Sequence, residues 1–179
     1  RFDEVDDAGR TIRAVAEGDL AAYKRLRDHA LAHHEEAFTS DAATEAQRTA
    51  QSYKARLGSD ADDQSGFTLG AWRGDRLVGA ITCERDPRSK VRHIGHIVGM
   101  MVMADQQGQG VGRALLDALI ARASADDEMH QLTLSVTAGN SAAVHLYESA
   151  GFTRYGSLPR AIRIGERFLD KQLMQLNLR

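Results

Sequence analysis

Apolar residues recur along the chain at two spacings, so strands and helices can be assigned segment by segment. Alternating apolar and polar residues, or a short apolar run between turn residues, predict strands at 11–16, 67–72, 77–83, 93–103 and 132–137, a strand region opening at 152–155, and a last strand through 174–178. Apolar residues three and four apart predict helices at 20–31, at about 40–57, after the glycines of 107–112, and from Asn140 to Gly151.

The order of these segments is a strand, two helices, three antiparallel strands, a helix, a strand, a helix and further strands. This mixed order predicts an α/β (α+β) domain rather than a doubly wound sheet. The chain has no internal repeat, low-complexity tract or Pro/Ser linker, so we expect residues 1–179 to form a single domain. The segment 93–103 is almost continuously apolar, which is typical of a strand buried on both faces.

Composition removes several classes of function. The 23 Lys and Arg residues nearly balance the 25 Asp and Glu residues, and only 6% of residues are aromatic, so a nucleic-acid partner is not expected. The longest apolar stretch, 97–104, is much shorter than the roughly 20 residues that span a bilayer, which argues against a membrane partner. Cys83 is the single cysteine, so a disulfide framework is excluded and a cytoplasmic location is expected.

A glycine-rich turn, 107–112, separates the apolar strand from the helix that follows it. Backbone amides at a helix start lack intrahelical acceptors, and glycine lets a phosphate approach closely, so this turn suits an anion. A Walker A loop requires Gly-Lys-Ser/Thr, whereas Arg113 and Ala114 follow Gly112 here. A Rossmann fingerprint fails as well, because Gln131 stands near the position of the expected acid. A turn whose glycines serve only packing is the remaining alternative.

Two motifs together resemble one family. Gln107-x-x-Gly110-x-Gly112 resembles the Q/R-x-x-G-x-G/A motif of the GNAT superfamily of N-acetyltransferases, and the segment 140–152 is similar to its second signature, in which an Asn and a Tyr precede a Gly-Phe. The resemblance implies a mixed central sheet, splayed between the fourth and fifth predicted strands, with helices on both faces. It implies acetyl-CoA as co-substrate, with the pyrophosphate held at 108–113 and the acetyl and pantetheine atoms at 101–103.

By this resemblance the acetyl-CoA site comprises Met101, Val102, Met103, Gln107, Gly108, Gln109, Gly110, Val111, Gly112, Arg113, Asn140, Ala143 and Tyr147. On a helix, Asn140, Ala143, Val144 and Tyr147 share one face. The tail from Gly156 is similar to that of members that acetylate small amines and amino-acid-like molecules, so a small amine, amino-acid-like or polyamine-like, is the expected acceptor. A homodimer is compatible with the sequence.

Acetyl transfer by direct attack needs a neutral amine, a donor for the developing oxyanion and a proton for the departing sulfur. Tyr147 matches the family's general acid, with a packed helix aromatic as the alternative. Many relatives carry a Glu on the strand at 93–103, and this chain has none there. The candidate bases are His96, His93, Glu84 and water, and the oxyanion donor is expected to be a backbone N–H near Val102.

Two further clusters invite other interpretations. His29 and His33 are one helical turn apart, but no third ligand is specified, so no metal is expected. The acidic run at Asp60, Asp62 and Asp63 is a solvated loop or a means of steering a cationic amine. The sequence predicts an N-acetyltransferase of small amines. The alternatives are an acyl-CoA-binding sensor of the same fold that does not catalyse, and an acetyltransferase of protein N-termini or lysines.

Overall fold

A computed structural model describes residues 4–5, 8–58 and 66–179. The strands are β1 (Glu4–Val5), β2 (Thr11–Ala14), β3 (Gly66–Arg73), β4 (Arg76–Arg85), β5 (Ile94–Val102), β6 (Gln131–Thr137), β7 (Thr153–Ile164) and β8 (Arg167–Asn177). The α-helices are α1 (Leu20–His33), α2 (Ala42–Ala46), α3 (Val111–Ala125) and α4 (Ser141–Ser149). Short 3-10 helices are η1 (Glu17–Asp19), η2 (Glu35–Ala37), η3 (Ala50–Arg56) and η4 (Ala104–Gln106).

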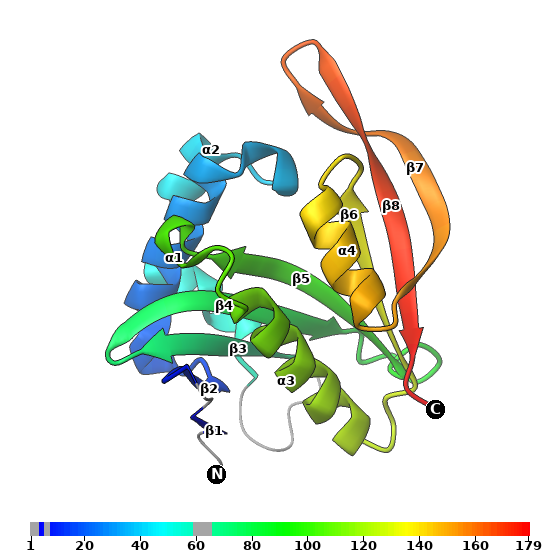
Figure 1. Cartoon of the computed structure of the whole chain (residues 1–179), viewed down its shortest axis with the longest axis horizontal. Helices are drawn as coiled ribbons and strands as arrows, with labels where there is room; N and C mark the ends of the chain where they lie inside the picture. The colour runs from blue at the N-terminus through cyan, green and yellow to red at the C-terminus, as the bar shows by residue number, and fades with distance from the viewer. Residues whose placement is uncertain (1–3, 6–7, 59–65) are drawn as a thin grey trace.

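The strands form one sheet in the order β1-β2-β3-β4-β5-β6-β8-β7 (Figure 1). All neighbouring strands run antiparallel except β5 and β6, which are parallel and are connected through α3. Gly74 and Asp75 close the β3–β4 hairpin between the strands predicted at 67–72 and 77–83, where Arg73 pairs with Arg76. The predicted mixed α/β architecture is confirmed.

The sheet opens in the middle. The β5–β6 ladder consists of Ile94, Gly95 and His96 paired with Gln131, Leu132 and Thr133. Beyond these pairs the two strands fan apart (Figure 1). This opening lies between the fourth and fifth of the predicted strands, as the sequence indicated.

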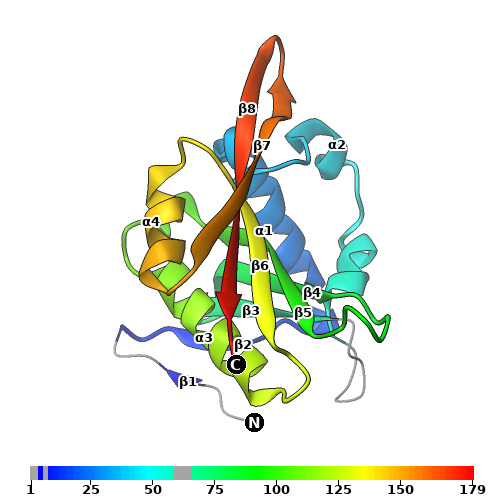
Figure 2. The same cartoon turned by 90° about the vertical axis from the view of Figure 1, so that its right-hand side faces the viewer.

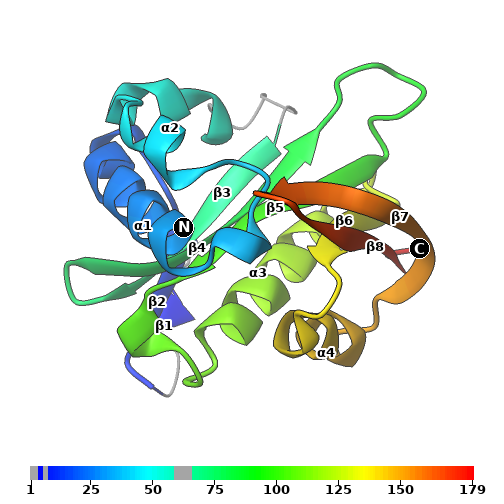
Figure 3. The same cartoon turned by 90° about the horizontal axis from the view of Figure 1, so that it is seen from above.

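Helices cover both faces of the sheet (Figure 3). Leu115, Leu116 and Leu119 of α3 pack on apolar residues of β3 to β6 and of β8, and together they form the larger core. On the opposite face, Tyr23 and Leu26 of α1 pack with Tyr53 of η3 and with Met101 of β5 in a second core. The opening between β5 and β6 therefore connects two faces that are each closed by helices.

The long β7–β8 hairpin forms one edge of the sheet and extends beyond α4 (Figure 2). It carries Tyr155, Leu158 and Phe168, which are large apolar side chains exposed to solvent. Among the described residues, no helix is both long enough and apolar enough to cross a bilayer.

The helix predicted at 40–57 is wrong, because the segment divides into α2 and η3. Asp41 caps α2 by accepting a hydrogen bond from the amide of Thr44. Glu45 of α2 and Tyr53 of η3 both turn inward, where the tyrosine hydroxyl donates to the carboxylate. Arg27 of α1 pairs with the same carboxylate at 3.3 Å. Glu45 and Tyr53 are eight residues apart, so on a single continuous helix they would lie about 12 Å apart along the axis, too far for this hydrogen bond.

The expectation that the strand at 93–103 is buried on both faces is also wrong. Gly95, Ile97 and Met101 are buried, whereas Val98, Met100 and Val102 are partly exposed. The partly exposed residues Val98, Met100 and Val102 line the cleft beside β6. The apolar residues of β5 therefore serve two purposes, because some pack in the core and others form a wall of the cleft.

Candidate active site

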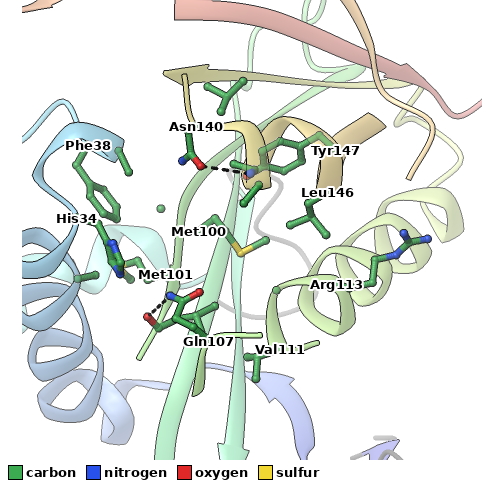
Figure 4. A pocket seen from close by; sticks show the side chains of 18 of the residues that line it. His34, Phe38, Met100, Met101, Gln107, Val111, Arg113, Asn140, Leu146 and Tyr147 are labelled. Atoms are coloured by element: carbon green, nitrogen blue, oxygen red, sulfur yellow. Dashed lines mark hydrogen bonds between the residues drawn. The ribbon is translucent and has the colours of Figure 1, made fainter. Parts of the chain in front are cut away.

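A cleft of about 520 Å³ lies where β5 and β6 separate (Figure 4). Its walls come from β5 and β6, from the start of α3, from α4, and from the end of α1 with the segment after it. This volume is within the range of small-molecule sites. Three separate stretches of the sequence, within 30–38, 97–113 and 135–147, thus meet at the opening of the sheet.

The floor at one end of the cleft is the glycine-rich turn before α3. Gly108 and Gly110 have φ values of 73° and 79°, a region that glycine adopts without strain. Gly110 is the N-cap of α3 and supplies no side-chain acceptor. Within the described chain, the backbone N–H groups of 108–113 have no recorded acceptor. A β-carbon on Gly108 would meet nothing within 4 Å, so the amides border open space. This cradle fits a pyrophosphate.

Two arginines brace the cradle from behind. Arg10 Nη1 donates to the carbonyl oxygen of Gln109 at 2.6 Å, and Arg73 Nη2 donates to Oε1 of the same residue at 2.9 Å. Arg113 instead binds Asp117 at 2.9 Å and Ser149 at 2.7 Å, and its side chain points away from the middle of the cleft (Figure 4). The cradle therefore combines backbone donors with nearby positive charge.

The wall formed by β5 contains a bulge. Val98 pairs with Thr82 and Met101 pairs with Ala80, so Gly99 and Met100 together oppose Ile81. Gly99 has a φ of 62°, which a residue with a β-carbon rarely adopts. Beyond the bulge, the side chain of Gln107 donates to the carbonyl of Val102 at 3.2 Å (Figure 4). From Ile97 onward no described strand pairs with the β5 edge toward β6, so this edge can pair with an extended ligand.

Helix α4 forms the opposite wall. Asn140 caps it by accepting a hydrogen bond from the amide of Ala143 at 3.3 Å. Tyr147 lies two turns further on, with its ring packed edge-on against Phe152 at 5.8 Å between centroids. Among the described residues, none is recorded as accepting a hydrogen bond from the Tyr147 hydroxyl, although the residue lines the cleft. Burial raises the pKa of this phenol to about 12, so it is protonated throughout the physiological range.

The predicted base His96 lies outside the lining of this cleft. It borders a second groove of about 570 Å³ together with Glu84, its partner across the β4–β5 ladder. The imidazole Nδ1 is 2.8 Å from Oγ1 of Thr133, which fixes the ring. Desolvation lowers the pKa of His96, against the opposing effect of Glu84, so the ring is neutral at neutral pH. His93 lines neither of these two grooves, and its ring lies edge-on against that of His130, with 5.9 Å between centroids.

Among the described residues, no group of three or more His, Cys, Asp or Glu side chains gathers in a way that could hold a metal ion, at the histidines of α1 or elsewhere. The rings of His29 and His33 stack at 3.9 Å between centroids. His29 Nε2 accepts a hydrogen bond from the amide of Ala104 at 3.1 Å, and desolvation lowers the pKa of this ring. His29 therefore fastens α1 to the turn after β5.

The structure brings most of the predicted acetyl-CoA residues into one cleft. Those that line it are Met101, Val102, Gln107, Gly108, Gly110, Val111, Gly112, Arg113, Asn140, Ala143 and Tyr147. Met103 and Gln109 do not line it, and Val144 packs toward the core. The acidic run at Asp60, Asp62 and Asp63 lies outside the described residues.

Several lining residues were not predicted. Leu146 and Met100 lie next to predicted positions, and Leu146, three residues after Ala143, was within reach of the helical spacing used for α4. His34 and Phe38 come from the end of α1 and the segment after η2, and both side chains lie across the cleft from Asn140 (Figure 4). No local signal marks these two residues, because only the packing of α1 on the sheet places them there.

Comparisons with known proteins agree with this geometry. The sequence profile of the acetyltransferase (GNAT) family matches residues 28–152. A mycothiol acetyltransferase from Geodermatophilus obscurus is 33% identical over 150 residues, which are 82% of this chain and 46% of that protein. The chain thus spans about half the length of the first curated relatives it matches. The L-amino acid N-acyltransferase MnaT of Escherichia coli is 29% identical over 94% of both chains.

Solved structures superpose over nearly the whole chain. An acetyltransferase of the GNAT family from Streptococcus pneumoniae has a TM-score of 0.85 at 27% identity, covering 94% of this chain and 98% of that one. The structure of yncA, a putative acetyltransferase from Salmonella typhimurium with its cofactor acetyl-CoA, has a TM-score of 0.76 at 25% identity, covering 95% and 94%. The family match and the split sheet with its glycine cradle lead to one assignment: the chain belongs to the GNAT acetyltransferase family.

Proposed function

We propose that this chain is an acetyl-CoA-dependent N-acetyltransferase that acylates the amine of a small, amino-acid-like acceptor. The observation that carries the proposal is the single cleft in which the free amides before α3, the unpaired edge of β5 and the hydroxyl of Tyr147 converge. Relatives named as acetylating methionine sulfoximine and L-amino acids support the acceptor class. We propose a single domain over 1–179 and a cytoplasmic location, and we leave a homodimer as a prediction.

Acetyl-CoA supplies an activated acetyl thioester. In our proposal the amides of 108–113 bind its pyrophosphate, and the free edge of β5 near Val102 aligns the pantetheine and donates to the carbonyl oxygen of the acetyl group. Asn140 and Ala143 fix the first turn of α4, which sets the position of Tyr147. The tyrosine hydroxyl then donates its proton to the sulfur as the thiolate leaves.

Direct attack by the amine is favoured over an acylated enzyme. Cys83, the single cysteine, is buried in the core beneath α3, and burial raises the pKa of its thiol to about 12. A neutral, buried thiol is a poor nucleophile. The amine therefore reacts with the thioester itself, and His96 is our proposed acceptor of the amine proton through intervening water. Glu84 and His34 are the alternatives, because one lies opposite His96 and the other lines the cleft.

Thiol release from acetyl-CoA over a panel of amines tests the proposal. The panel contains L-amino acids, polyamines and peptides with free N-termini or lysines. Rapid release with an amino acid supports the proposal. Release only with peptides indicates a protein acetyltransferase, and binding of acetyl-CoA without release to any amine indicates a sensor; either result contradicts the proposal.

A further inference from the structure

Arg56, the last residue of η3, reaches the bulge of β5 from the face of the sheet that carries α1. A β-carbon built on Gly99 would lie 2.7 Å from Nη1 of this arginine. Gly99 itself lines the cleft. The guanidinium thus sits at the point where the sheet begins to open, on the side opposite the cradle.

Hydrogen bonds of the backbone carbonyl and of the guanidinium hold Arg56 in this position. The Thr68 hydroxyl donates to the carbonyl of Arg56 at 2.6 Å and is 2.8 Å from the Thr82 hydroxyl. Nη1 of Arg56 donates to the Tyr23 hydroxyl at 3.2 Å. Two strands and α1 therefore position a long cationic side chain that, on a surface, would be mobile.

The guanidinium has donors to spare. It carries five N–H groups, and the contact with Tyr23 engages Nη1 alone. Among the described residues, no carboxylate lies within ion-pair distance of Arg56, in contrast to the arginines of α1 and β4 that bind Glu45 and Asp126. A planar fork of donors matches a carboxylate in a bidentate geometry.

We infer that Arg56 binds the carboxylate of the acceptor and selects α-amino acids over other amines, an inference that rests on the proposed function. In an α-amino acid, two bonds separate the amine nitrogen from the carboxyl carbon. A carboxylate held above Gly99 therefore keeps the amine beside Met100 and the free edge of β5, where the acetyl group is expected. The absence of a side chain on Gly99 leaves the room that the Arg56 guanidinium occupies beside the bulge.

The test compares acceptors that differ only in the carboxylate. The kcat and KM values are measured for several L-amino acids, their amides and the corresponding decarboxylated amines. The variants are R56Q, R56K and, as a matched control, K54Q. Lys54 is an exposed cation on the same 3-10 helix and pairs with Glu17. Melting temperature and acetyl-CoA affinity are recorded for every variant.

The wild-type protein should prefer the free acids. R56Q should raise KM for the acids about 10- to 100-fold, the usual range for one hydrogen-bonded charge, and leave the amides within about twofold. R56K should fall between, and K54Q should match the wild type for all acceptors.

Three results would overturn the inference. If the wild-type protein acetylates amides and amines as well as the acids, Arg56 does not select a carboxylate although the acetyltransferase proposal stands; this arm decides the matter even if R56Q fails to fold. Equal losses on all acceptors with a lower melting temperature would make Arg56 a structural latch for η3. If only peptides or no amines react, the proposed function fails together with the inference.

Discussion

Replacing Tyr147 by phenylalanine isolates one hydroxyl group. The phenylalanine ring keeps the contact with Phe152. Among the described residues the Tyr147 hydroxyl has no recorded hydrogen-bond partner, so the substitution breaks no recorded hydrogen bond. We therefore expect the free energy of unfolding to change by less than about 1 kcal/mol, below the usual contribution of an intramolecular hydrogen bond. The effect on catalysis should be far larger than the effect on stability.

The pKa of about 12 defines what the hydroxyl can do. A free thiol has a pKa near 8.5, so a complete proton transfer from this phenol to a solvated thiolate is uphill by roughly 5 kcal/mol. In a cleft poor in water the thiolate loses its solvation, and a fixed donor offsets that loss. We expect kcat for Tyr147→Phe to fall roughly 10²- to 10³-fold, the scale for removing one such donor.

The assay measures kcat from thiol release at saturating acetyl-CoA and amine, with chemistry as the limiting step. The dissociation constant for acetyl-CoA is measured in parallel and should hardly change. Tyr155→Phe is the matched control, since Tyr155 is exposed on β7 and away from the cleft. A phenylalanine variant of Tyr147 that reacts at the wild-type rate would refute the reasoning. A second refutation would be a loss of wild-type activity centred on pH 10, the pKa of an unburied tyrosine.

Three other perturbations test separate parts of the structure. Acetyl-CoA at 100 times its dissociation constant should stabilise the protein by about 2.7 kcal/mol, or roughly 5–10 °C in melting temperature, and Gly110→Glu should abolish this shift in a scanning fluorimetry assay. If His96 is the base, the fall in kcat/KM caused by its protonation should begin only at a pH below about 6.5, the ordinary pKa of an imidazole, because the pKa of its ring is lowered. His96→Asn should remove this fall, while His34→Asn keeps it. Burial by itself would raise the pKa of Glu45, but the hydrogen bond from Tyr53 and the charge of Arg27 outweigh burial and lower this pKa. The ionised carboxylate therefore stabilises the fold above pH 4.5, and this contribution is lost as the pH falls through the lowered pKa. Glu45→Gln should cost about 3–5 kcal/mol in chemical denaturation, because Arg27 would remain charged and buried; a change below 1 kcal/mol would contradict this.

The parts of the fold that sequence could predict are those with local causes. The strand predicted at 132–137 and the helix predicted from Asn140 each depend on the spacing of neighbouring residues, and both are confirmed. The cradle was predictable because free amides and glycines occur together in one short segment. These features require no knowledge of what packs against them.

The features that sequence missed depend on distant contacts. The break between α2 and η3 lets Glu45 and Tyr53 meet beside Arg27, which is 18 residues from Glu45. Arg56 reaches Gly99 because of the β5 bulge, and neither residue stands out in its own segment. His34 and Phe38 became cleft residues only through the packing of α1 on the sheet. Rules based on residue spacing describe one helix or strand at a time, so they do not detect contacts between distant elements.

The short ladder between β5 and β6 has a mechanical consequence. Three residue pairs of the sheet join β5 to β6. The two halves also meet in the core beneath α3 and where the Thr137 hydroxyl donates to the carbonyl of Glu36 in η2 at 2.7 Å. A ligand that bonds to the edge of β5, to α3 and to α4 stands where further rungs of the ladder would be. Acetyl-CoA then acts as a strut as well as a reactant, and the amides of 134–137 should exchange with solvent more slowly when it is bound, whereas those of β3 and β4 should be unaffected.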